Sequence, residues 1–191
     1  MENIVYIHGA NSSPRSFKHI QNNLPRHNIL NIEYSIDTPL IENVEKIKHA
    51  ITNEFPLESV SIISHSLGGL IAMKLHDYQK VNKIVTMSAP FGGSKFIKYL
   101  KWICPNYQIF SDIKPNSKVI KGIKKSSYTK PILSIVTSAG GNPLMGEEND
   151  GTVTVASQLS AIGPLFEKYD LSHFEVLLSD RVIKRINQFL F

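Results

Sequence analysis

The feature that most limits the fold of this 191-residue chain is the alternation of short apolar β-type runs with longer segments of helical period. Such alternation is typical of α/β proteins, in which helices connect the strands of a mainly parallel sheet. We therefore predict a sheet of about six strands with helices on both faces. The expected strands cover residues 3–7, 28–34, 59–63, 83–87, 132–137 and 165–169.

Helices are expected in the segments between these strands. Ser13 is a predicted N-cap, with Pro14 at the first helical position, and a second helix should begin at Thr38-Pro39. A third helix should follow Ser66. The last helix has an apolar stripe formed by Phe174, Leu177, Leu178, Val182, Ile186 and Leu190.

The length and composition bound the class of protein. With 42% hydrophobic and 19% charged residues, 191 residues suit one folded domain covering positions 1–191. No apolar run approaches the ~18 residues of a membrane span, and the start MENIVYIHGA lacks the features of a cleaved signal, so we expect a cytoplasmic location. The single cysteine, Cys104, excludes an internal disulfide. No Cys/His cluster has zinc-site spacing, and no metal or cofactor is expected.

One turn has the composition of a catalytic site. Residues 59–75 run from an apolar strand through Ser64-His65-Ser66 into a helical pattern that contains two glycines. A serine is a poor nucleophile unless a base removes its proton. On a sharp strand-to-helix turn, Ser66 Oγ would point outward at the carboxyl edge of the sheet, beside backbone amides that favour an oxyanion. Ser66 is therefore a candidate nucleophile, and a simple strand-ending turn is the alternative.

The stretch SHSLGG at 64–69 resembles the nucleophile elbow of the α/β-hydrolase superfamily, G-x-S-x-G, which reads GHSLGG in many lipases and esterases. Ser64 stands where the family pattern has glycine, and its side chain is small enough for the tight turn. The sequence SAPFGGS at 88–94 also resembles a lipase loop, S-x-P-x-x-G-S, at the same point of the fold. The resemblance implies a small α/β-hydrolase fold without the first two strands of larger members.

The resemblance also implies the partners of the serine, because the family's triad has the order serine, acid, histidine. Asp150 lies in NDGTVTVASQ, which resembles the acid loop of lipases related to lecithin:cholesterol acyltransferase and of the inositol deacylases. Glu147 and Glu148 are alternatives, in which case Asp150 is a turn former. His173 follows the last expected strand. By this resemblance, His173 takes the proton of Ser66 and Asp150 orients the imidazole.

Two backbone N–H groups are candidates for the oxyanion hole. One belongs to Leu67, the residue after the nucleophile. The other belongs to Ala10, because His8-Gly9-Ala10 resembles the family's HG-x loop, whose third residue supplies a donor. His8 and His65 adjoin these loops, and we expect them to be structural or loop-positioning residues.

The segment 91–130 differs from the rest of the chain in charge. It contains nine lysines and one acid, Asp112, a balance of +8 against +5 for the whole chain. Hydrolases of this type carry a lid or cap here, so we predict a lid-like insertion over about 91–130. Lys95, Lys98 and Lys101 recur at three-residue steps, which indicates an amphipathic helix. The candidate substrate and lid residues are Phe91, Phe96, Leu100 and Trp102.

The basic insertion suggests partners of two kinds. An amphipathic helix with lysines on one side could lie on an anionic membrane surface or cover an apolar substrate. A solvated lysine-rich face is the alternative. No known motif or arginine cluster accompanies the charge, so no nucleic-acid partner is expected.

These residues together predict a serine hydrolase that cleaves a carboxylic ester through an acyl-enzyme. The lipase-like loops favour a small-molecule or lipid ester as substrate. A thioesterase or an amidase is the alternative enzyme, because the same triad serves each and the pocket decides. A lipid-binding or partner-binding module that keeps the fold without the activity is the alternative outside the enzymes.

Overall fold

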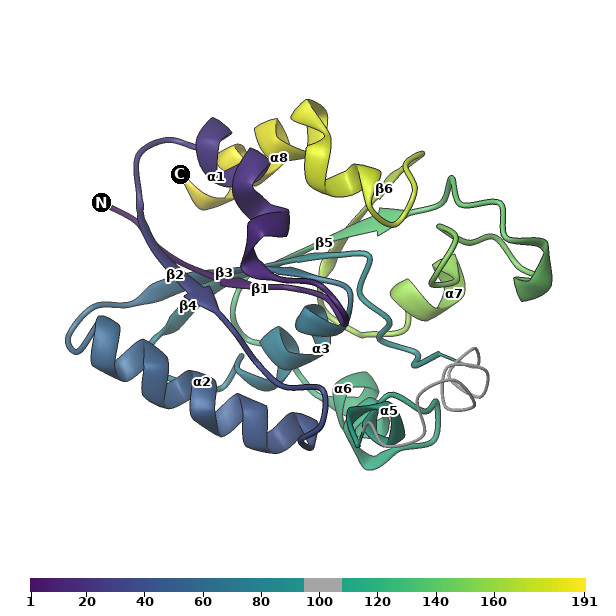
Figure 1. Cartoon of the computed structure of the whole chain (residues 1–191), viewed down its shortest axis with the longest axis horizontal. Coiled ribbons are helices and arrows are strands. Elements are labelled where there is room, and N and C mark those ends of the chain that lie inside the picture. Colours follow the sequence, from purple (N-terminus) through teal and green to yellow (C-terminus); the bar gives the residue numbers. More distant parts are fainter. Residues whose placement is uncertain (95–107) are drawn as a thin grey trace.

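The computed structural model describes residues 1–94 and 108–191, and its centre is a six-stranded, all-parallel sheet (Figure 1). The strand order is β2-β1-β3-β4-β5-β6. This confirms the predicted fold class. The strands are β1 Asn3–Ile7, β2 Asn28–Ile32, β3 Val60–His65, β4 Val81–Met87, β5 Ile132–Thr137 and β6 Leu165–Tyr169.

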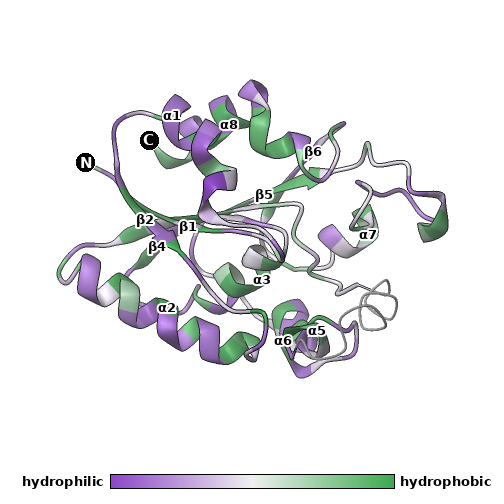
Figure 2. Ribbon diagram, in the orientation of Figure 1, coloured by the Kyte–Doolittle hydropathy of each residue, from purple (hydrophilic) through white to green (hydrophobic). Residues whose placement is uncertain are grey.

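Helices cover both faces of the sheet (Figure 1). On one face lie α1 (Lys18–Asn23) and α8 (Asp180–Leu190), and on the other lie α2 (Leu40–Glu54), α3 (Leu67–Lys74) and α6 (Lys118–Lys125). The short helix α5 (Ile109–Asp112) lies beside α6, and the short helix α7 (Val155–Gln158) lies beyond the carboxyl ends of the strands. The inner strands β1, β3 and β5 are buried along their whole length and are largely apolar, as expected for a sheet covered on both faces, whereas the edge strands β2 and β6 are partly exposed (Figure 2).

The two-residue period of the strands divides the core into two apolar clusters. In β1, Val5 and Ile7 pack in the cluster that contains the buried side chains of α2, α3 and α6. Ile4 and Tyr6, which point the other way, pack in the cluster that contains those of α1 and α8. The sheet is therefore held between two cores, and its carboxyl edge is left for the connecting loops.

Two helices begin differently from the prediction. After Ser13 the chain forms a 3₁₀ helix, Pro14–Phe17, and the Ser13 side chain makes no cap hydrogen bond. The last helix also begins later, because a 3₁₀ turn, Glu175–Leu178, precedes α8. Phe174 and Leu178, assigned above to its apolar stripe, are each 64% exposed. Leu177 in the same 3₁₀ turn is buried, so the helical spacing predicted only part of the apolar stripe before α8.

The described part of the insertion packs against the body of the molecule. Ile120 and Ile123 of α6 are buried, and Asp112 Oδ2 accepts a hydrogen bond of 2.8 Å from the Leu40 N–H at the start of α2. Phe91, predicted to contact substrate or form part of the lid, is instead a core residue with 0% exposure. Ala89 and Pro90, just before it, are buried as well, so the segment after β4 is covered by other parts of the protein.

Other predictions for this insertion concern residues outside the described ones. These are the amphipathic helix with Lys95, Lys98 and Lys101, and the lid candidates Phe96, Leu100 and Trp102. The lid, and the single domain that carries it, stay predictions. Within residues 1–94 and 108–191, every helix is too short or too polar to cross a membrane. The cytoplasmic location also stays a prediction.

Candidate active site

Ser66 lies between the end of β3 and the start of α3, in a backbone conformation that is rare for a residue with a side chain. Its φ is 52° and its ψ is −122°. Such strained residues are concentrated at functional sites, where the surrounding structure holds them in place. This is the strand-turn-helix geometry of a nucleophile elbow.

The two glycines after Ser66 let α3 lie close to the sheet. A Cβ on Gly68 would lie 2.2 Å from the carbonyl oxygen of Ile7, and one on Gly69 would lie 2.4 Å from the Cβ of Ala89. Both distances are far below van der Waals contact. The N-terminus of α3 can therefore approach β1 and the segment after β4 only where side chains are absent.

His173 lies between Ser66 and Asp150. Its Nδ1 is 2.8 Å from Asp150 Oδ2, and its Nε2 is 3.0 Å from Ser66 Oγ. The carboxylate only accepts, so Nδ1–H donates to it, and the lone pair of Nε2 is left to accept from the serine hydroxyl. A backbone hydrogen bond joins the same two residues, since the His173 N–H donates to the Asp150 carbonyl at 2.9 Å. The structure thus brings together the three residues predicted as a triad.

The Asp150 carboxylate is fully buried and has a dense set of donors. Oδ1 accepts from the N–H groups of Thr152 and Val153, at 2.9 and 2.7 Å. Besides His173, Oδ2 accepts from Thr137 Oγ1 at 2.7 Å and from Gln158 Nε2 at 3.3 Å.

These donors decide the charge of Asp150. Burial by itself raises the pKa of the carboxyl, but the hydrogen bonds from His173, Thr137 and Val153 and the positive charge on His173 together hold that pKa below its ordinary value. Asp150 is therefore a stable anion, which is what an imidazolium beside it requires.

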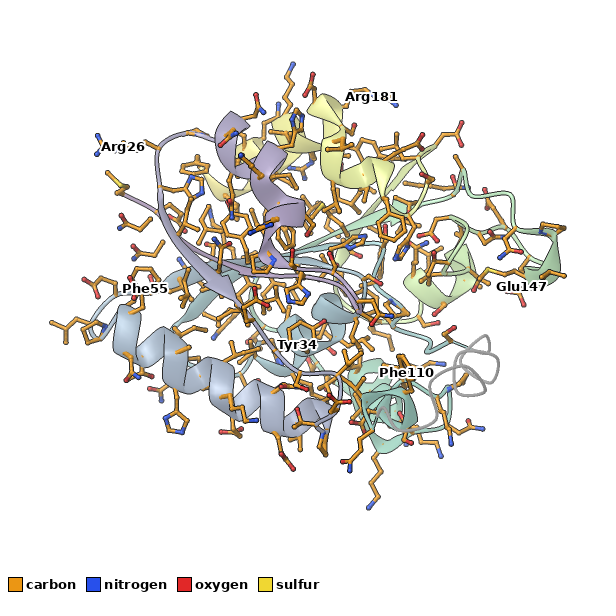
Figure 3. All side chains as sticks on the ribbon, in the orientation of Figure 1. Arg26, Tyr34, Phe55, Phe110, Glu147 and Arg181 are labelled. Carbon is orange, nitrogen blue, oxygen red and sulfur yellow. The ribbon has the colours of Figure 1, made fainter. Side chains whose placement is uncertain are left out.

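The alternative acids, Glu147 and Glu148, are both exposed. Glu148 pairs with Lys168 on β6, and Figure 3 shows Glu147 at the outer edge of the molecule. Asp150, and neither glutamate, occupies the position beside His173 Nδ1.

The loop 8–10 lies directly against Ser66, as an oxyanion loop requires. A Cβ on Gly9 would lie 3.1 Å from Ser66 Cβ, so Ala10 follows a residue in near contact with the nucleophile. Leu67 is the first residue of α3, where the N–H has no intrahelical acceptor. Both candidate donors, Ala10 and Leu67, therefore belong to segments that border Ser66.

Tyr34 supports this loop from the side of the sheet that faces α2 (Figure 3). Its hydroxyl donates to the His8 carbonyl at 2.8 Å, and its ring stacks on the His8 imidazole with centroids 4.6 Å apart. His8 Nδ1 in turn hydrogen-bonds the Gly9 carbonyl at 2.8 Å. His8 is therefore part of the loop structure, as predicted.

Two polar residues of the site, Thr137 and Gln158, were not predicted, and neither was the contact of His65 with the His173 carbonyl. Thr137 ends β5, and Gln158 ends α7, where its amide also bonds the Thr137 backbone. Gln158 is 1% exposed and Thr137 is 0% exposed. A polar residue at the carboxyl end of a buried strand, as Thr137 is, was the signal available in the sequence.

Two cavities open near the site. One, of about 620 Å³, lies between the loop containing His8, the segment after β2 and α2. The other, of about 490 Å³, lies between residues 92–94, the 3₁₀ turn Pro143–Met145 and residues 152–160. Ser66 is not among the described residues that line either cavity. No group of three or more His, Cys, Asp or Glu side chains in the described parts of the chain is arranged to hold a metal ion.

Known proteins of similar structure include lipases and esterases. The mature form of lipase BlEst2 from Bacillus licheniformis superposes with a TM-score of 0.74 at 17% identity, over 99% of this chain and 91% of that one. A lipase-esterase related protein from Clostridium acetobutylicum gives a TM-score of 0.69 at 15% identity, over 98% and 94%. The chain has an α/β-hydrolase fold.

Two further comparisons concern this α/β-hydrolase-fold protein. Phospholipase PlaB from Legionella pneumophila is similar over all of this chain and 59% of its own, with a TM-score of 0.78 and 12% identity. The PGAP1-like alpha/beta domain family matches residues 38–101, which include SHSLGG. No curated protein has a matching sequence.

Proposed function

We propose that the protein is a serine hydrolase that cleaves carboxylic esters through an acyl-enzyme, with Ser66 as nucleophile, His173 as general base and Asp150 as the acid. The observation that carries the proposal is the chain of two hydrogen bonds from Ser66 Oγ through the imidazole to a buried carboxylate. The similarity to lipases and esterases supports ester hydrolysis as the type of reaction.

In the acylation step, Ser66 Oγ attacks the ester carbonyl carbon and its proton passes to His173 Nε2. The carbonyl oxygen becomes an oxyanion, which the N–H groups of Ala10 and Leu67 stabilise. Asp150 stabilises the imidazolium without taking its proton. The tetrahedral intermediate collapses, the bond to the alcohol oxygen breaks, and the leaving alkoxide takes the proton from Nε2.

In the deacylation step, a water molecule replaces the alcohol. His173 Nε2 takes one proton from the water, whose oxygen attacks the acyl carbon and again forms an oxyanion. Collapse of this second intermediate breaks the bond to Ser66 Oγ, which recovers its proton from Nε2. The carboxylic acid leaves, and the enzyme has returned to its first state.

A fluorophosphonate probe tests the nucleophile directly, because it reacts with an activated serine and ignores ordinary hydroxyls. We expect the wild type to be labelled, Ser66→Ala to be unlabelled, and Ser127→Ala, which removes an exposed serine just after α6, to be labelled like the wild type. No labelling of the folded wild type would contradict the enzyme and favour a binding module of the same fold.

The substrate class can be separated by the leaving group. Hydrolysis of nitrophenyl esters with different acyl lengths, of matched thioesters and of matched amides should show the highest kcat/KM for an ester. A thioester or an amide preferred over every ester would assign the same triad to the alternative reaction.

We also propose that the basic insertion contacts anionic membrane surfaces. The lysines of α6, Lys118, Lys121, Lys124 and Lys125, are exposed, whereas its apolar residues face the core. Binding should therefore be electrostatic and weaken as salt rises. Replacing these four lysines by Gln should abolish the preference for anionic over neutral vesicles, and replacing Lys18 and Lys184 on the opposite face of the sheet should not. Equal binding of the wild type to both vesicle types would refute the proposal.

A further inference from the structure

His65, the residue before the nucleophile, bonds to the backbone of the catalytic histidine. Its Nε2 lies 2.8 Å from the His173 carbonyl oxygen. A carbonyl oxygen can only accept, so the proton of a neutral His65 is on Nε2 and the bond is a donation to His173. The two residues are 108 positions apart in the sequence.

The surroundings of His65 leave its ring little freedom. It is 1% exposed, and its ring centroid lies 4.8 Å from that of His173 and 5.9 Å from that of Phe174. Its Nδ1 is buried and has no hydrogen-bond partner in the described parts of the chain. That nitrogen lies toward Gly9, where a Cβ would be only 3.1 Å away. Leaving a buried polar atom unpaired is costly, so the contact made by Nε2 has to offset that cost.

His173 is therefore fixed at three points. Its side chain donates to the Asp150 carboxylate, its N–H donates to the Asp150 carbonyl, and its own carbonyl accepts from His65. The first two bonds tie His173 to the acid loop. Besides the bond to Ser66 Oγ itself, the third ties the backbone of His173 to the end of β3, because His65 and Ser66 are adjacent.

We propose that His65 is a positioning residue, which fixes the distance between His173 Nε2 and Ser66 Oγ by anchoring the His173 carbonyl to the end of β3. This inference rests on the proposed function of the triad. A misplacement of about 1 Å between reacting groups can lower a rate about 100-fold. The bond therefore acts on the transition state more than on substrate binding.

A positioning group beside a base must not compete with it for protons. Burial in the first place, and then the charge of the nearby His173, lower the pKa of His65 to about 3, against smaller opposing effects of its hydrogen bond and of Asp150. His8 also lowers the pKa of His65. His65 thus stays neutral over the range in which His173 must accept and release a proton.

Two substitutions separate the hydrogen bond from the packing. In His65→Gln the amide nitrogen can reach the place of Nε2 and still donate, whereas His65→Leu fills the space without a donor. We expect His65→Leu to lower kcat about 10- to 100-fold with little change in KM, and His65→Gln to recover most of the loss. His76→Leu, which removes a buried histidine bonded to the Met73 carbonyl, should leave kcat unchanged.

The outcomes distinguish this inference from the proposed function. If the fluorophosphonate probe does not label the wild type, the proposed function fails and the positioning role fails with it. If the wild type is labelled and folded His65→Leu is labelled at the same rate, or if Gln and Leu reduce the rate equally, the positioning role alone is overturned. Should His65→Leu not fold, ¹⁵N NMR of the wild type decides: a proton on Nε2 of His65 from pH 5 to 8 supports the role, and one on Nδ1 overturns it.

Discussion

Lowering the pH from 7 to 5 should destabilise the protein through His65, although this residue stays neutral in the folded state. Its pKa is lowered from 6.5 to about 3 by burial. In the unfolded chain the pKa returns to about 6.5. The unfolded state therefore binds more protons than the folded state over this range, so the free energy of unfolding falls as the pH falls.

The magnitude follows from the unfolded state alone, because folded His65 is unprotonated at both pH values. Protonation stabilises an unfolded histidine of pKa 6.5 by about 0.2 kcal/mol at pH 7 and by about 2 kcal/mol at pH 5. The contribution of His65 to the loss of stability is the difference, roughly 2 kcal/mol. That is a large fraction of the stability of an ordinary domain.

The assay is urea unfolding followed by far-UV circular dichroism, with the wild type and His65→Gln measured at pH 7 and pH 5. Every other titrating group is common to both proteins, so only His65 changes the gap between their free energies of unfolding. Between pH 7 and pH 5, the free energy of unfolding of the wild type should fall by about 2 kcal/mol relative to that of His65→Gln. A gap for His65→Gln that is constant with pH would refute the reasoning.

Two further substitutions test the elbow and the acid. Gly68→Ala would bring a Cβ within 2.2 Å of the Ile7 carbonyl oxygen, so it should lower the free energy of unfolding by about 1–3 kcal/mol; an unchanged urea midpoint would contradict the close packing of α3. Asp150→Asn should lower kcat about 10⁴-fold, because it disturbs the tautomer of His173, while Glu148→Gln should leave esterase activity unchanged; the reverse result would make Glu148 the acid.

Much of the fold could be predicted from local patterns. The limits of β1, β5 and β6 were predicted without error, because each is a short run of β-type residues bounded by turn residues. The helix boundaries were less accurate. The backbone before α8 forms a 3₁₀ turn that the spacing of apolar residues does not reveal, and this error placed Phe174 in the core when it is exposed beside His173.

The candidate site also contains residues that could be predicted from the sequence and contacts that could not. Ser66, Asp150 and His173 could be chosen because parallel strands bring their carboxyl ends to one edge, so loops far apart in sequence meet there. Their geometry agrees with this choice, and their catalytic role stays a prediction. The contacts of His65 and Gln158 could not be predicted from the sequence, because each side chain bonds to a backbone group whose position depends on the whole fold.

Ser64, where the family pattern has glycine, shows how a departure from a motif can fit the fold. Its side chain is completely buried, and a buried hydroxyl without a partner would be costly. Its Oγ donates to the Val85 carbonyl of β4 at 2.9 Å. A carbonyl oxygen has two lone pairs, so it can accept this bond in addition to a bond within the sheet. The position two residues before Ser66 therefore excludes large side chains, but it does not require glycine. Serine fits there because it is small and its hydroxyl can donate a hydrogen bond.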